Sequence, residues 1–81
     1  MKVPRDLSGD DLANALSKLG YHPTRQTGSH WRLTTYRSGE HHVTIPRHDF
    51  LKIGTLSGIL NDVATHLGIS RRELHEELFG R

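Results

Sequence analysis

Leucines recur at helical spacing in the first part of the chain. Leu12, Leu16 and Leu19 lie four and three positions apart, so they share one face of a helix. Ser8 before them is a typical N-cap residue, and Gly20 after them is a typical residue for a helix end. The pattern therefore predicts a helix between these two residues, with its leucines toward a core.

The last third of the chain carries this pattern twice more. One apolar face has residues at positions i, i+3, i+4, i+7 and i+11, namely Leu56, Ile59, Leu60, Val63 and Leu67. Gly68 closes this helix, and Ser70 with Glu73 forms a capping box that begins a further, shorter helix. His66 and His75 lie in these two helices, and we expect both on helix surfaces.

The centre of the chain has the character of a β-sheet. Residues 30–36 and 40–46 are rich in β-branched and aromatic residues. Residues 21–27 before them fit an edge strand, because Pro23 cannot donate a hydrogen bond inside a sheet. Two short glycine-containing turns separate the three runs, so the sequence predicts three consecutive strands.

The loop between the last two strands predicts how they pair. With three loop residues, opposing residue numbers add to 76, so Leu33 faces Val43 and Trp31 faces Ile45. A two-residue loop would instead set Leu33 opposite Thr44. We favour the three-residue loop, because it gathers the apolar side chains on one face. The opposite, outer face then carries His30, Arg32, Thr34, Tyr36, Glu40, His42 and Thr44.

Length and composition limit the class of protein. With 81 residues and no cysteine, we expect a single domain spanning residues 1–81, without disulfides or a cysteine-type zinc site. Neither a signal-peptide pattern nor a membrane-spanning run is present, so we expect a soluble cytoplasmic protein that does not enter a membrane.

Positive charge is concentrated in the middle of the chain. The net charge is only +2, but residues 21–52 hold five basic and two acidic residues together with five histidines. A cationic centre between nearly neutral ends indicates an anionic partner, of which nucleic acid is the first candidate. A few surface arginines would give the same pattern without any such role.

The histidines of residues 27–49 are first considered as metal ligands. His41 and His42 are adjacent in a strand and point to opposite faces, so they cannot bind one metal ion together. His30, His42 and Glu40 share the outer face, but the predicted register puts them at different levels. We therefore predict no metal site and no cofactor.

His30 is better placed for acid/base chemistry. It follows the tight turn Gly28-Ser29 at the start of a strand, and Arg32 lies two residues further on the same face. Neutral imidazole can take a proton from a ribose 2′-hydroxyl, while an arginine and backbone amides can bind the phosphate. A lone histidine is more often structural, so the pattern by itself leaves both interpretations open.

Several motifs together resemble a known family. The chain has "LGY" at the end of its first helix, then "GSHWRL", then "VTIPRHDFLKIGTLSGILNDVATHLGIS". In this order the motifs are similar to the HicA-type mRNA interferases, the toxins of HicA–HicB toxin–antitoxin systems. The resemblance runs from about Leu12 to Leu78. Its most specific segments are Gly28-Ser29-His30, Pro46-x-His48, and Gly54-Thr55-Leu56 leading into Ile59-Leu60.

The resemblance implies a fold, an activity and a partner. The fold is α+β, of the double-stranded-RNA-binding-like α-β-β-β-α type, here with a short extra C-terminal helix. The activity is metal-independent endoribonuclease cleavage of mRNA, with His30 as the catalytic residue. The partner is a HicB-type antitoxin that covers the active site.

The predicted RNA contacts surround His30. They are Gly28, Ser29, Arg25, Arg32, Arg47, His48 and Lys52. Many family members have lysine or arginine directly before the Gly-Ser-His motif, whereas this chain has Thr27, which leaves the identity of the flanking phosphate contact open. For His48, a general acid or substrate contact and a loop histidine beside the helix are equally compatible with the sequence.

Two other functions are compared with the nuclease. A non-catalytic RNA-binding module of the same fold would need a cluster of lysines near the start of the last main helix. Only Lys52 lies there, and residues 55–67 contain no lysine or arginine, which favours the nuclease. A small protein-interaction adaptor explains neither the cationic centre nor His30.

Overall fold

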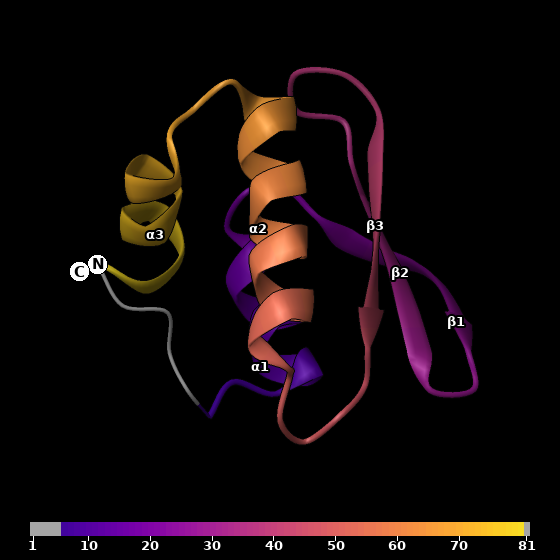
Figure 1. Ribbon diagram of the computed structural model, residues 1–81. Helices are drawn as coiled ribbons and strands as arrows, with labels where there is room; N and C mark the ends of the chain where they lie inside the picture. Colours follow the sequence, from indigo (N-terminus) through magenta and orange to yellow (C-terminus); the bar gives the residue numbers. More distant parts are fainter. Residues whose placement is uncertain (1–5, 81) are drawn as a thin grey trace.

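Three helices and three strands make up residues 6–80, the part of the chain that the computed structural model describes (Figure 1). In order they are α1 Gly9–Ser17, β1 His22–Thr27, β2 His30–Thr35, β3 His41–Pro46, α2 Ile53–Leu67 and α3 Arg71–Phe79. The predicted α+β fold with α-β-β-β-α order and an extra C-terminal helix is confirmed. None of the helices in this part of the chain is long and apolar enough to cross a membrane.

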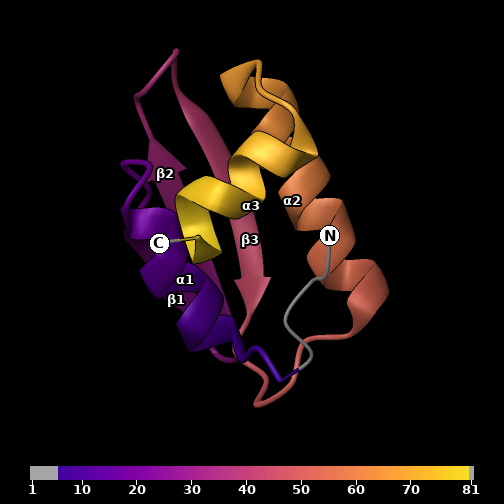
Figure 2. The same ribbon diagram turned by 90° about the vertical axis from the view of Figure 1, so that its left-hand side faces the viewer.

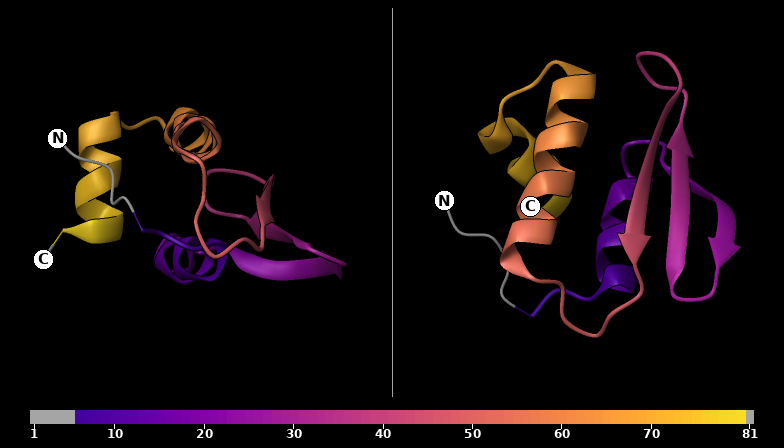
Figure 3. Two further views of the ribbon diagram at one scale, coloured as in Figure 1. Left: turned by 60° about the horizontal axis from the view of Figure 1, so that its bottom comes forward. Right: turned by 45° about the vertical axis from the view of Figure 1, so that its right-hand side comes forward.

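The three strands form one antiparallel sheet in the order β1-β2-β3, with β1 at an edge as predicted. Helices α1 and α2 cover one face of this sheet, and the other face is open (Figure 3). Helix α3 lies across α1 and α2 on their side away from the sheet (Figure 2). The fold therefore leaves one whole face of the sheet for contacts with other molecules.

The pairing of β2 with β3 follows the predicted register. Leu33 is opposite Val43 and Trp31 is opposite Ile45, and the remaining pairs also add to 76. Gly39 follows Ser38 in the connecting loop, and both have positive φ, which the tight reversal requires. The apolar side chains of both strands consequently point toward the helices, where Leu33 and Ile45 are fully buried.

The core lies between this face of the sheet and the helices. Its fully buried leucines include Leu12 and Leu16 of α1 and Leu60 of α2, and α3 adds Leu74. Each such side chain contributes about 1.5–3 kcal/mol through removal of apolar surface from water. The sequence pattern that predicted the three helices thus also identified the residues that hold them together.

Capping boxes are present at the starts of α1 and α3, the second of them as predicted. The Ser8 hydroxyl accepts a hydrogen bond from the Asp11 backbone N–H, and the Asp11 carboxylate accepts one from the Ser8 backbone N–H. Ser70 and Glu73 make the same reciprocal pair at the start of α3. Each box satisfies backbone donors that the first helical turn leaves without a partner.

An irregularity in β1 was not predicted. His22 and Pro23 pair with β2 in one register, whereas Arg25 pairs with Arg32 in a register shifted by one residue, so Thr24 is an extra, bulged residue. As a result Arg25 lies on the open face of the sheet, directly opposite Arg32.

The two histidines expected on helix surfaces both make contacts within the protein, and one of them is buried. His75 is only 7% exposed and packs edge-on against Phe79, because α3 turns this face toward the other helices. His66 is half-buried, and its Nε2 donates to the backbone carbonyls of Arg37 and Gly39 at 2.9 and 3.1 Å. The surface prediction was wrong for His75, whereas the partly exposed His66 holds the loop between β2 and β3 against α2.

His41 lies on the helix side of the sheet near its edge, as the register predicted. Its ring stacks on that of His66 at 4.3 Å, and its Nδ1 is 2.8 Å from the hydroxyl of the fully buried Tyr21. Asp62 of α2 is 3.3 Å from its Nε2. Burial, with the nearby Asp62 charge, raises the pKa of Tyr21 to about 12. Because these contacts occupy both ring nitrogens of His41, we assign it a structural role.

Candidate functional site

The turn between β1 and β2 places His30 at the start of the central strand. Gly28 has a φ of 49°, in the left-handed region, and the two-residue turn brings Thr27 opposite His30. The His30 side chain is exposed, and its Nδ1 is 3.3 Å from the Ser29 hydroxyl. The imidazole is therefore accessible to a substrate, and its other nitrogen, Nε2, makes no hydrogen bond within residues 6–80.

Arg32 and Arg25 continue the same open face beyond His30. Arg32 is two residues along β2, so its side chain points to the same side, and Arg25 is its cross-strand partner. Both side chains are exposed, and within the described part of the chain neither takes part in an ion pair. The structure thus brings three of the predicted site residues together on one surface.

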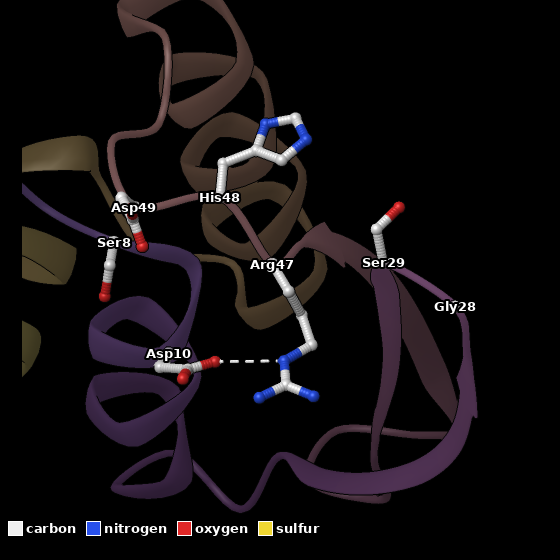
Figure 4. A pocket seen from close by; sticks show the side chains of 7 residues that line it. All are labelled: Ser8, Asp10, Gly28, Ser29, Arg47, His48 and Asp49. Atoms are coloured by element: carbon white, nitrogen blue, oxygen red, sulfur yellow. Dashed lines mark hydrogen bonds and ion pairs between the residues drawn. The ribbon is translucent and has the colours of Figure 1, made fainter.

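Other predicted residues meet in an open pocket of about 370 Å³ beside the turn (Figure 4). It lies between the start of α1, the β1–β2 turn and the segment that follows β3. Its lining residues are Ser8, Asp10, Gly28, Ser29, Arg47, His48 and Asp49. Four of the predicted RNA contacts are among them, but His30, Arg25, Arg32 and Lys52 are not.

Backbone hydrogen bonds hold the segment after β3 against its neighbours. The Arg47 N–H donates to the Ser29 carbonyl at 2.7 Å, and the Gly9 N–H donates to the His48 carbonyl at 2.9 Å. The first bond joins the pocket to the turn that carries His30, and the second joins it to α1. The position of this segment therefore depends on both neighbours.

Arg47 is already engaged within the protein. Its Nε is 3.3 Å from an Asp10 carboxylate oxygen, and its guanidinium carbon lies 4.6 Å from the centre of the Trp31 ring. Figure 4 shows the side chain directed toward Asp10. An RNA phosphate would have to compete with Asp10 for this group, whereas it would meet no such competitor at Arg25 or Arg32.

His48 and Lys52 are both exposed; His48 lines the pocket, whereas Lys52 lies outside it. The His48 side chain makes no hydrogen bond to another residue of 6–80, although its backbone carbonyl accepts from Gly9. Lys52 is the N-cap residue of α2, and its side chain makes no capping bond. Both side chains are free to meet a ligand, but they lie on a different segment from the arginine pair.

His42 is hydrogen-bonded through both of its ring nitrogens. Its Nδ1 is 2.7 Å from the Thr34 hydroxyl and its Nε2 is 2.9 Å from a Glu40 carboxylate oxygen. Glu40 and His42 therefore meet, contrary to the expectation that they lie at different levels, because residues two apart share a face. Within residues 6–80, no three histidine, aspartate or glutamate side chains are arranged to hold a metal ion.

Comparison with known proteins identifies the family of the chain. A family model described as the HicA toxin of bacterial toxin–antitoxin systems matches residues 9–64, from the start of α1 into the last turn of α2. Helix α3 lies outside this match, so the likeness covers less of the C-terminal part than the motifs suggested. Searches of curated proteins and of solved structures found no match. More than half of the chain fits the family model, and the chain therefore belongs to the HicA toxin family.

Proposed function

We propose that this toxin cleaves messenger RNA by acid/base chemistry at His30, without a metal ion or cofactor. Membership of the HicA family gives the role of a toxin in a toxin–antitoxin system. The observation that carries the proposal is the accessible His30 on the same open face as two arginines that lack internal ion pairs. A proton acceptor beside two anion-binding groups suits the cleavage of a phosphodiester.

The reaction follows from the two nitrogens of His30. If Nδ1–H donates to the Ser29 hydroxyl, 3.3 Å away, Nε2 carries the lone pair and can accept the proton of a ribose 2′-hydroxyl. The 2′-oxygen then attacks the adjacent phosphorus, and the bond to the 5′-oxygen of the next nucleotide breaks. A proton goes to that leaving oxygen, and His48 is a candidate donor. The arginines bind the RNA backbone beside the reacting phosphate.

The test compares RNA with DNA of the same sequence. We expect the purified chain to cut a single-stranded RNA transcript at an unchanged rate in EDTA and to leave the DNA strand intact, since DNA has no 2′-hydroxyl. Once a cut site is mapped, a single 2′-deoxynucleotide at that site should block cleavage there alone. Cleavage of the deoxy-substituted RNA, or a requirement for added metal, would contradict the mechanism. Binding without cleavage would favour the alternative, a non-catalytic RNA-binding module.

The antitoxin is proposed to be of the HicB type and to cover the open face. Arg25, Arg32 and Arg37 are exposed there or at its rim, so a surface that covers them should be acidic. We expect association to be fast at low salt and to slow markedly as salt is added, and Arg32→Gln to weaken this dependence. Dissociation should respond less to salt, because buried contacts control it.

Competition shows where the antitoxin binds. A non-cleavable RNA should displace the antitoxin, because both occupy the open face. Stopped-flow association rates across a salt series and a displacement assay measure the two effects. A stable ternary complex of toxin, antitoxin and RNA with His30 still accessible would mean that inhibition works through another surface.

A further inference from the structure

The bulge at Thr24 determines which residue of β1 faces Arg32. Without it, the register of His22 and Pro23 would continue, Thr24 would face Arg32, and Arg25 would face Trp31 on the helix side. The extra residue moves Arg25 to the open face, opposite Arg32, and brings Thr27 opposite His30. The bulge therefore creates a pair of guanidinium groups on this surface.

This pair is unfavourable for the protein alone. Like charges directly opposite each other in neighbouring strands destabilise a sheet, and neither arginine has an ion-pair partner within residues 6–80. By contrast, Arg47 pairs with Asp10. Two facing guanidiniums are relieved by an anion that both can bind, and phosphate suits their planar donor groups.

A chain of side-chain hydrogen bonds holds the bulge in place. The Thr24 hydroxyl is 2.8 Å from the Thr34 hydroxyl, which is 2.7 Å from Nδ1 of His42, and Nε2 of His42 is 2.9 Å from Glu40. A carboxylate only accepts, so Nε2 of His42 donates to Glu40, and a neutral His42 then accepts from Thr34 at Nδ1. The Thr24 hydroxyl lies within reach of both Thr34 and the Arg32 carbonyl oxygen, which is 3.3 Å away. The chain crosses all three strands, and Thr34 at its centre is only 2% exposed.

The pair also lies at a useful distance from His30. Arg32 is two residues beyond His30 on the same strand, which corresponds to about 6.7 Å along the sheet. This spacing is of the order of the distance between neighbouring nucleotides in an extended RNA strand. An RNA strand with its scissile phosphate at His30 would therefore bring a neighbouring phosphate to the arginines.

We propose that the Arg25–Arg32 pair binds the phosphate next to the one cut at His30, and that Thr34 and His42 are positioning residues that maintain the pair. The proposal rests on the ribonuclease function proposed above. This chain has Thr27, and not a lysine or arginine, directly before its Gly-Ser-His motif. The proposal assigns the contact with the flanking phosphate to Arg25 and Arg32 instead.

The test removes one phosphate charge at a time. In an RNA oligonucleotide with one mapped cut site, each linkage flanking that site is replaced in turn by an uncharged methylphosphonate. We expect one replacement to raise KM about 10- to 100-fold for the wild-type chain, and Arg25→Gln to raise it similarly on the natural RNA. On that modified substrate, Arg25→Gln should raise KM little further. Arg72→Gln, an exposed arginine of α3, is the control and should change neither KM nor kcat.

The positioning residues have their own readout. Thr34→Val keeps the shape but removes the hydroxyl, so we expect a raised KM on natural RNA, little change in kcat, and no added penalty on the modified substrate. Thr34→Ser should restore the wild-type KM. A residue that only stabilises the fold would lower the melting temperature without this dependence on one phosphate.

The outcomes separate this proposal from the proposed function. If the wild type cleaves RNA but Arg25→Gln and Arg32→Gln leave KM unchanged on every substrate, the pair is not a phosphate site while the nuclease stands. If the wild type does not cleave, anisotropy binding of the same oligonucleotides still tests the pair. Variants that bind RNA normally but lose antitoxin affinity would overturn the proposal and assign the pair to the protein interface.

Discussion

His30→Ala should reduce the rate of RNA cleavage about 100- to 10,000-fold, the usual contribution of a positioned general base. The same variant should no longer arrest growth when expressed. Its fold should be unchanged, because the His30 side chain is exposed and its one hydrogen bond within residues 6–80 is to the adjacent Ser29. Single-turnover cleavage rates, with the melting temperature measured in parallel, test both parts of this prediction.

Other histidines of the chain provide the controls. His22 is also exposed but lies at the opposite end of β1 from the turn, so His22→Ala should cleave like the wild type. His48→Ala separates two roles: a general acid would lower kcat, whereas a loop histidine would leave it unchanged. A folded His30→Ala protein that cleaves at the wild-type rate would exclude the proposed mechanism. Comparable losses in all three variants would indicate that the histidines act by a general charge effect.

The sequence predicted the β2–β3 pairing correctly because both strands have one buried face. A shift of one residue would have put Leu33 and Ile45 on opposite faces of the sheet, with one of them in water, so the apolar pattern selected one register. Strand β1 has no such pattern, since all six of its residues are exposed. Because β1 has no alternation of buried and exposed residues, the bulge at Thr24 could not be predicted from the sequence. The Arg25–Arg32 pair depends on this bulge and was therefore missed as well.

The contacts of the histidines depend on tertiary structure in the same way. His66 meets loop carbonyls that are 27 and 29 residues away in the sequence, and Arg47 meets Asp10 across 37 residues. Helical periodicity indicates which face of a helix is apolar, but α3 buries His75 beside Leu74 and Leu78 on a face that is only partly apolar. The residues of the candidate site could thus be named from the sequence. Which of them lie on the open face and which line the pocket could not.

Gly9→Ala should destabilise the fold by about 3 kcal/mol or more, the largest effect that we expect from a single methyl group in this chain. A Cβ at Gly9 would overlap the carbonyl oxygen of Pro46 and lie 3.0 and 3.1 Å from the Pro46 carbonyl carbon and the Arg47 Cα. All three are backbone atoms, so no side-chain rotation can relieve the overlap. Helix α1 would have to move away from the segment after β3, which would break the bond from the Gly9 N–H to the His48 carbonyl.

Gly58→Ala is the matched control for this substitution. Gly58 lies in the exposed face of α2, and a Cβ there would meet no atom within 4 Å. Because alanine loses less conformational entropy than glycine when a helix forms, Gly58→Ala should stabilise the fold by about 0.5–1 kcal/mol. Urea unfolding of both variants measures the difference directly. If Gly9→Ala unfolds at the wild-type midpoint, α1 and the segment carrying Arg47 and His48 can separate without cost, and the pocket between them does not depend on their close approach.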